Sequence, residues 1–396
     1  MKHLFLLFLL PFFLVAKEKI CLNMIVKNQV DAIGPCLDSA KSFIDSWVII
    51  DLGSTDGTQD LIRQRLRDIP GMLYERSWKS FGENRTEALE LAKSQGGYLL
   101  FLDAQDVLTL EKNFKFPALD KDIYYSWQGT ANFSSLRPLL AKANLPLKWV
   151  GVTHEYLDCE KPHTKATLLG IRSLLNGGRV NVQDPKKAWN QVKLLEKALK
   201  DDPQNHRYAF YLAENYRDAG EKGKALECFQ KRVRMGGWEE EVFWSKLQIA
   251  HMLRDLGLPP AIAIEAYKEA HAYRPHRPEP VYYLSQLYQA QNDHAKSYEL
   301  LKAQEKIVQP PQKDVLFNQE WIDRYGLLFQ LSLCTYYIGK YEECFDLCNQ
   351  LLMMDTLPKH LQEQVSKNRF FPLSKIEECH FGNGSIGSSA TRQNRP

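Results

Sequence analysis

The sequence has almost no excess of charge of either sign, which argues against one broad class of partner. Its 396 residues contain 51 lysines and arginines against 48 aspartates and glutamates, so the formal net charge is only +3. Proteins that bind nucleic acid through its phosphates normally carry a strong basic excess. The loop Arg274-Pro-His276-Arg277 adds only two arginines. The composition therefore predicts no nucleic-acid partner.

Paired cysteines with metal-ligand spacing are also missing. None of the eight cysteines belongs to a C-x-x-C pair. Cys344 and Cys348 would share one face of a helix, but no second pair of ligands accompanies them. We therefore expect the cysteines to be buried core thiols.

No long apolar run suited to crossing a bilayer is found at the N-terminus. Residues 1–16 have a basic start and a twelve-residue apolar run, followed by Lys17. Such a run is short for a transmembrane helix and typical of a signal peptide or signal anchor. Leu14 stands where a small residue usually precedes a cleavage site after Ala16, so both cleavage and tethering remain open. Either way, we expect an exported or membrane-associated protein.

The rest of the chain reads as two globular domains and a tail. A hydrophobic content of 44% with 25% charged residues is that of a globular protein, and 396 residues exceed one ordinary core. We expect an α/β domain over residues 17–185 and a helical domain over 186–371. The final segment, 372–396, ends in Gly- and Ser-rich sequence and is expected to be disordered.

Strand-like and helix-like runs alternate up to about residue 115, which predicts βαβ units and a mainly parallel sheet. Expected strands are 19–26, 47–51, 71–76, 98–103, 123–128, 135–141 and 165–172, and expected helices are 32–43, 59–67 and 83–92. The loop around residues 176–185 is the expected domain boundary.

From Lys186 onward the chain is helical and repetitive. The segment Leu212-Ala-x-x-Tyr216-x-x-x-Gly220-x-x-x-x-Ala225-x-x-x-Phe229 matches the tetratricopeptide pattern, and similar segments surround Tyr288 and Gly339. In such repeats, small residues allow paired helices to cross closely, while each unit buries its apolar face against its neighbours. We expect a tetratricopeptide-like helical domain.

Two expected strands end in carboxylates. Val48-Ile-Ile-Asp51 breaks into a Gly/Ser/Thr/Asp turn, and Tyr98-Leu-Leu-Phe-Leu-Asp103 is followed closely by Asp106. Ligands of open α/β sheets bind at such strand ends. Clustered carboxylates repel one another unless a cation, a hydrogen-bond donor or water is near. A metal–diphosphate is therefore the natural candidate ligand.

Together these segments resemble a known family. In order along the chain stand Cys21-Leu-Asn-Met-Ile-Val-Lys-Asn28, Asp51-x-Gly-Ser-Thr-Asp-Gly-Thr58, Phe81-Gly-x-Asn-Arg-Thr-Glu-Ala-Leu89, Phe101-Leu-Asp-Ala-Gln-Asp106, Leu136-Arg-Pro138 and Trp149-Val-Gly-Val-Thr-His-Glu-Tyr156. This set resembles family 2 glycosyltransferases of the GT-A fold, and its last motif is similar to that of lipopolysaccharide-core β-glucosyltransferases. The resemblance covers roughly residues 19 to 183.

The resemblance implies a nucleotide-sugar site. Asp51 would accept hydrogen bonds from the base or ribose, while Asn84 and Arg85, near a helix N-terminus, would bind ribose or phosphate. The full set of expected nucleotide-sugar-binding residues is Asn23, Lys27, Asp51, Asn84, Arg85 and Asp103.

The resemblance also implies a divalent metal, Mn²⁺ or Mg²⁺, and a general base. The expected metal ligands are Asp103, Gln105, Asp106 and His154. Gln105 replaces the carboxylate that the family uses most directly on the metal; an amide adds no charge, so metal dependence is in question. Glu155 is the expected base of an inverting transfer, with Asp158 as the alternative.

The expected function is transfer of a sugar from a nucleoside-diphosphate sugar, with UDP favoured, to a hydroxyl of a glycan or lipid-linked acceptor. A protein partner could bind the helical repeats. The alternative is a degenerate transferase domain, inactive because of Gln105, that serves as a scaffold for such a partner. A nucleotidyltransferase is disfavoured because no glycine-rich phosphate loop follows the first expected strand.

Overall fold

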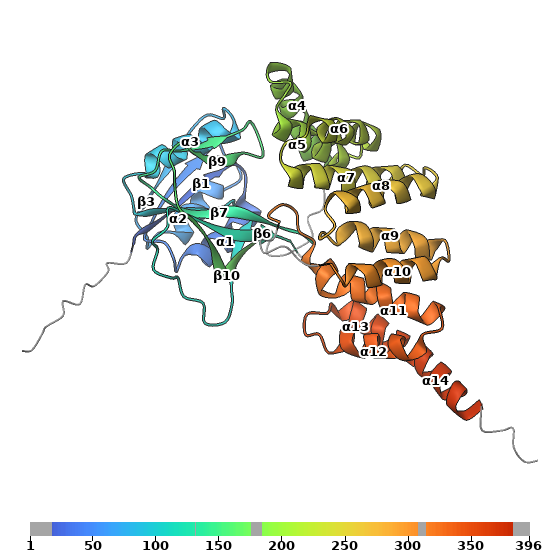
Figure 1. Cartoon of the computed structure of the whole chain (residues 1–396). Helices are drawn as coiled ribbons and strands as arrows, with labels where there is room; N and C mark the ends of the chain where they lie inside the picture. Colours follow the sequence, from blue (N-terminus) through green and yellow to red (C-terminus); the bar gives the residue numbers. More distant parts are fainter. Residues whose placement is uncertain (1–17, 131, 176–183, 308–313, 383–396) are drawn as a thin grey trace, which may run out of the picture. The chain divides into compact units, whose positions relative to one another are not determined.

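The computed structural model describes residues 18–130, 132–175, 184–307 and 314–382 (Figure 1). The chain forms two compact units: residues 1–128 with 136–179, and residues 129–135 with 180–396. The expected signal segment, 1–16, lies outside the described residues. None of the described helices is sufficiently long and apolar for a membrane span.

The first unit is built on an eight-stranded mixed sheet. Its strand order is β3-β2-β1-β4-β7-β6-β10-β5. Strands β3, β2, β1 and β4 pair in parallel, whereas β7 runs antiparallel to β4 and β10 antiparallel to β5. The strands are β1 (Ile20–Val26), β2 (Ser46–Asp51), β3 (Gly71–Glu75), β4 (Tyr98–Phe101), β5 (Asp106–Leu110), β6 (Ile123–Gly129), β7 (Ser134–Lys142) and β10 (Lys165–Leu175).

Strand β1 shows why the sheet is a central layer. All seven of its residues are buried, as expected for a strand covered on both faces. Leu22 and Met24 pack in a cluster with α1 (Val30–Ala40) and α2 (Thr58–Arg65), whereas Ile25 packs with α3 (Phe81–Ala92) on the opposite face. The predicted α/β class of the N-terminal unit is therefore confirmed.

Three short strands were not foreseen from the sequence. β5 begins at Asp106, at the end of the loop that starts at Asp103, and pairs with β10, which lies more than sixty residues further along the chain. Strands β8 (Leu147–Val150) and β9 (Tyr156–Cys159) form a separate two-stranded sheet. β5 depends on a distant partner, whereas β8 and β9 pair with each other but have only four residues each, so all three leave little local signal.

The second unit consists of antiparallel helix pairs. Its elements are α4 (Pro185–Asp201), α5 (His206–Asp218), α6 (Lys222–Met235), α7 (Glu239–Asp255), α8 (Pro260–Tyr273), α9 (Glu279–Ala290), α10 (His294–Gln304), the π-helix η2 (Ile322–Gly326), α11 (Leu327–Tyr337), α12 (Tyr341–Leu352), α13 (Lys359–Asn368) and α14 (Phe370–Gly382). From α4 to α10, each helix packs against the next, as does α11 against α12 (Figure 1).

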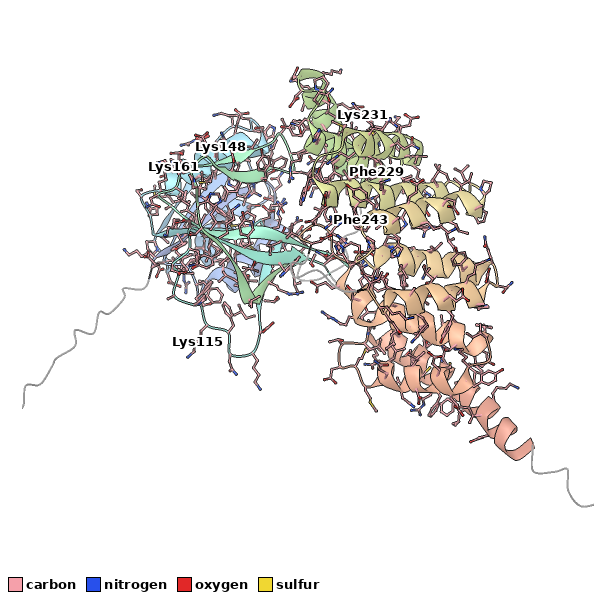
Figure 2. The ribbon with its side chains drawn as sticks, viewed as in Figure 1. Lys115, Lys148, Lys161, Phe229, Lys231 and Phe243 are labelled. Atoms are coloured by element: carbon pink, nitrogen blue, oxygen red, sulfur yellow. The ribbon has the colours of Figure 1, made fainter. Side chains whose placement is uncertain are left out.

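The helix pairs share one turn design. A residue with positive φ stands between the two helices of four successive pairs, namely Gly220, Gly257, Asn292 and Gly339. Glycine and asparagine tolerate this left-handed conformation, which ends one helix and lets the chain reverse. Inside the stack, Phe229 of α6 and Phe243 of α7 are fully buried (Figure 2). The tetratricopeptide-like architecture is confirmed.

The expected disorder of residues 372–396 requires a correction. Residues 372–382 are helical as part of α14, which packs on α12 and α13. The ring of Phe371 lies 6.2 Å from that of Tyr336. This apolar start holds the helix, because the Gly- and Ser-rich composition begins only near its end. Residues 383–396 lie outside the described residues.

Candidate active site

Asp51 ends β2 and is completely buried. Its Oδ2 atom accepts hydrogen bonds from the backbone N–H groups of Gly53, at 3.1 Å, and Ser54, at 2.9 Å, and from Gln59 Nε2, at 2.8 Å. The other oxygen, Oδ1, has no hydrogen-bond partner among the described residues. A buried acceptor without a donor is unfavourable, so this oxygen is suited to a ligand N–H or O–H group.

Arg85 connects two carboxylates at the centre of the site. Its Nη2 atom pairs with Asp103 Oδ1, and its Nε atom lies 2.5 Å from Glu155 Oε1 in an ion pair. The guanidinium stacks over the ring of Trp149, at 5.0 Å from the centroid. Burial disfavours the charge on Arg85, but the two carboxylates outweigh it and raise the pKa of the guanidinium. Arg85 is therefore a fixed positive charge.

The start of α3 brings Arg85 to this position. Ser80 caps the helix by accepting a hydrogen bond from the backbone of Glu83, at 3.2 Å. One residue into the helix, Gly82 donates a backbone hydrogen bond to Gly151 O, at 3.1 Å. A side chain at position 82 would place its Cβ only 2.7 Å from that oxygen and 2.9 Å from Trp149 O. Glycine thus lets α3 lie directly against the segment that leads to Glu155.

Asp106 stabilises the loop that follows β4. Its Oδ2 atom accepts a hydrogen bond from the backbone N–H of Asp103, at 2.9 Å, and Gln128 Nε2 donates to both carboxylate oxygens, at 2.9 Å each. Burial, reinforced by the charge of Asp103, raises the pKa of Asp106 above its ordinary range. No sequence motif marks Gln128, because only the position of β6 in the sheet brings it here.

Arg85, Asp103 and Asp106 border an open pocket of about 300 Å³, a volume that includes its solvent-facing part, and Asp51 lies outside its lining. The pocket contains three of the predicted site residues and adds six others. Five of these belong to the motifs that carry the family resemblance, without a predicted role, and Gln128 belongs to none of them. Its lining consists of Arg85, Phe101, Leu102, Asp103, Asp106, Gln128, Arg137, Pro138 and Trp149. Glu155 adjoins the pocket through its ion pair with Arg85.

Two of the predicted nucleotide ligands are hydrogen-bonded within the domain. Asn23 is buried in β1, and its Nδ2 atom donates to Ala88 O of α3 at 2.8 Å. Asn84 has no exposed surface: its Oδ1 atom accepts from Lys79 N, at 2.9 Å, and its Nδ2 atom donates to Ser77 O, at 3.2 Å. Both amides are thus engaged with backbone atoms of this domain. Their predicted contacts with nucleotide stay predictions.

Other predicted residues lie outside the pocket lining. Lys27 is exposed just after β1, and Gln105 is half-buried in the loop after β4. Asp158 lies on β9, where Lys148 Nζ approaches its Oδ2 atom at 3.5 Å; Lys148 is labelled in Figure 2. His154 has a positive φ of 50° in the loop before Glu155. Their proposed roles stay predictions.

The residues present do not form a ready divalent-metal site. In the described part of the chain, no group of three or more His, Cys, Asp and Glu side chains is arranged to hold a metal ion. Asp103 is paired with Arg85, and Asp106 accepts hydrogen bonds within its own loop. Gln105 adds no charge. The predicted set Asp103, Gln105, Asp106 and His154 therefore does not make a preformed cage.

The comparison with family models concerns this α/β domain. Residues 21–113 match the model described as glycosyl transferase family 2. The chain thus carries a family 2 glycosyltransferase domain in its first unit.

Among curated proteins, the chain is similar to the SPbeta prophage-derived glycosyltransferase SunS of Bacillus subtilis (strain 168). The two are 22% identical over 223 residues, which represent 53% of this chain and 52% of SunS. The glycosyltransferase SunS of Bacillus phage SPbeta gives the same values. The chain spans about half the length of the curated relatives it matches.

The comparison with solved structures returns helical-repeat proteins. The crystal structure of MamA is 18% identical, with a TM-score of 0.31, and the match covers 51% of this chain and 98% of MamA. YrrB, described as a TPR protein with an unusual peptide-binding site, is 12% identical, with a TM-score of 0.33, over 48% of this chain and 84% of YrrB. At such TM-scores these matches carry no argument about function.

Proposed function

We propose that the protein transfers a sugar from a nucleoside-diphosphate sugar to an acceptor hydroxyl. The observation that carries this proposal is the arrangement of Arg85 between Asp103 and Glu155 beside an open pocket. It holds a carboxylate, for an incoming hydroxyl, beside a pocket that can receive a leaving phosphate. The family 2 match over residues 21–113 supports the same reaction class.

Asp51 is the proposed contact to the nucleoside. Its buried Oδ1 atom lacks a donor among the described residues, while backbone and Gln59 donors hold the rest of the carboxylate. A pyrimidine N–H or a ribose hydroxyl would supply the missing hydrogen bond. Uridine offers both groups, so UDP is the favoured nucleotide.

Glu155 is the proposed general base. One of its oxygens contacts Arg85, and its Oε2 atom has no partner within the described residues. In an inverting transfer, the acceptor oxygen forms a bond to the sugar C1 as the bond from C1 to the phosphate oxygen breaks. The diphosphate leaves with that electron pair, and the hydroxyl proton passes to the carboxylate of Glu155. Arg85 holds the carboxylate in place.

For the acceptor, we propose a glycan or a lipid-linked sugar. The N-terminal apolar run of residues 1–16 would direct the protein to a membrane or an export route, where such acceptors occur. The helical repeats would bind a protein partner or present the acceptor, because stacked helix pairs form extended binding surfaces. Cell fractionation and acceptor screening would test these two proposals.

Release of UDP from a panel of UDP-sugars, with and without glycan acceptors, tests the reaction itself. Because a general base contributes about 10²–10⁴-fold to the rate, Glu155→Gln should lower turnover by at least about a hundredfold. The Kd for UDP should change by less than about threefold, since only the base is removed. Glu160→Gln is the matched control, because Glu160 is 67% exposed and pairs with Lys148 alone among the residues that the structure describes.

The outcome also separates the enzyme from the scaffold alternative. A degenerate scaffold has no need of nucleotide affinity, so absence of UDP binding in calorimetry, together with absence of UDP release, would favour that alternative. Full turnover in Glu155→Gln would reject Glu155 as the base and direct attention to Asp158.

A further inference from the structure

Two arginines line the same pocket, and they differ in whether the guanidinium is paired with a carboxylate. Arg85 is engaged with Asp103, Glu155 and the face of Trp149. Arg137, on β7, also lines the pocket and is half-buried. Within the described part of the chain, Arg137 makes no ion pair and no hydrogen bond. One guanidinium of the pocket is thus committed to protein carboxylates, and the other is available.

The sheet register explains how Arg137 reaches the pocket. Strands β4 and β7 are antiparallel, with Tyr98 opposite Lys142 and Leu100 opposite Leu140. Following β7 back toward its start therefore leads past the end of β4, where Asp103 stands. Pro138 comes next to Arg137 and restricts the backbone of the preceding residue to an extended conformation. Arg137 therefore has a fixed place at the end of the sheet where β4 terminates, which is also where Asp103 lies.

An unpaired, half-buried guanidinium is unfavourable unless something pairs with it. Partial burial removes part of its hydration, and the described residues supply no compensating acceptor. The planar fork of arginine donors matches the oxygens of a phosphate, and arginine is a common ligand for phosphate groups. A diphosphate in the pocket would satisfy Arg137 without disturbing the ion pairs of Arg85.

We propose that Arg137 binds the diphosphate of the donor, and that donor binding consequently needs no divalent cation. The proposal rests on the function proposed above and adds the ligand group that this residue contacts. It agrees with the arrangement of the carboxylates: Asp103 is neutralised by Arg85, and no cluster of acidic or histidine side chains in the described residues is arranged for a metal ion. The protein supplies the positive charge that a metal ion would otherwise bring.

Two claims need testing: that Arg137 contacts the diphosphate, and that donor binding needs no divalent cation. Calorimetric titration of the full chain with UDP and with UMP, in EDTA and then with Mn²⁺, tests both. In the parent protein, the Kd for UDP should differ by less than about threefold between the two conditions. A charge-assisted contact contributes enough that Arg137→Gln should raise the Kd for UDP about tenfold. The Kd for UMP should change much less, since UMP lacks the β-phosphate. Arg137→Lys should lie between, because it keeps the charge but not the fork.

Arg67→Gln is the matched control for loss of one positive charge, because Arg67 is 76% exposed in the same unit and, among the described residues, pairs only with the adjacent Asp68. Circular dichroism checks that each variant is folded. If Arg137→Gln does not fold, the proposal can be tested on the parent protein. Inorganic pyrophosphate in EDTA should raise its Tm and compete with UDP.

The outcomes separate this inference from the function on which it rests. UDP binding that disappears in EDTA, or an unchanged UDP affinity in Arg137→Gln, would overturn the role of Arg137 and leave the transferase proposal standing. Failure of pyrophosphate to compete with UDP would also overturn that role. If neither UDP nor UMP binds in either condition, both proposals are overturned.

Discussion

The close approach of α3 to the segment before Glu155 makes Gly82→Ala the most informative perturbation of the fold. The added Cβ would stand 2.7 Å from Gly151 O, 2.9 Å from Trp149 O and 3.2 Å from Gly151 N. All three are backbone atoms, so no side chain can rotate away. Ordinary contact requires a displacement on the order of half an ångström, which weakens the hydrogen bond from Gly82 N to Gly151 O.

The expected stability loss follows from opposing contributions. Overpacking costs about 1–3 kcal/mol, and a weakened hydrogen bond costs about 1 kcal/mol. Alanine favours a helix over glycine by about 1 kcal/mol, which offsets part of the loss. The free energy of unfolding should therefore fall by about 1–3 kcal/mol. Arg85 lies one turn further along α3, so its ion pair with Glu155 should shift as well.

Urea denaturation and UDP release are the two assays for this variant. Small misplacements of reacting groups cost much, so turnover should drop by about ten- to a hundredfold. Gly223→Ala is the control: Gly223 lies in α6, and an added Cβ there meets nothing within 4 Å. That variant should be neutral or slightly stabilised. If Gly82→Ala keeps both the stability and the turnover of the parent, α3 does not pack directly against the backbone of Trp149 and Gly151 as described.

Two further predictions concern buried titratable groups. Asp51→Asn replaces the unpaired Oδ1 atom by a donor in one of its amide orientations, so calorimetry should show a Kd for UDP raised about tenfold or more, with Tm nearly unchanged; an unaltered Kd would mean that Asp51 does not face the nucleotide. Burial, aided by Arg254 and Arg217, lowers the pKa of His251 to about 3. The folded state disfavours the protonated ring, so between pH 6.5 and pH 3 only the unfolded state takes up this proton. The free energy of unfolding is therefore unaffected by His251 above about pH 6.5, the unfolded pKa, and decreases as the pH falls toward 3. Urea denaturation between pH 7 and pH 4 should show this loss, and the unfolding free energy of His251→Gln should depend less on pH. Equal slopes of unfolding free energy against pH in parent and variant would refute the prediction.

Local sequence patterns are sufficient to predict the position of residues that begin or end a helix or strand. Asp51 follows an apolar strand and precedes a Gly/Ser/Thr turn, so its place at the sheet edge is visible from neighbouring residues. Arg85 lies in the first turns of a helix whose start is marked by a capping serine. In both cases the interactions that fix the residue involve neighbours only a few positions away in the sequence, so a local pattern predicts them.

The remaining residues depend on contacts between distant segments. The amide of Asn23 is engaged by Ala88, 65 residues away, and no local pattern distinguishes it from a ligand-binding amide. Gln128 and Arg137 reach the pocket only because β7 and β6 follow β4 in the sheet. Asp106 was predicted as a metal ligand, yet it begins β5 and holds its own loop. Nonlocal strand pairing is what short-range pattern reading misses.

The connection between β6 and β7 has a consequence for how this protein can be divided. Residues 129–135 belong to the helical unit, although the strands on either side extend into the other unit. Within the helical unit, Ser134 and Asn318 exchange backbone hydrogen bonds of 2.8 and 2.7 Å, and the rings of Phe133 and Phe317 lie 5.7 Å apart. The chain therefore passes from one unit to the other three times. A single recombination point cannot exchange either unit whole, so a chimaera made by one crossover near residue 185 should inherit a helical unit without its matching hairpin tip.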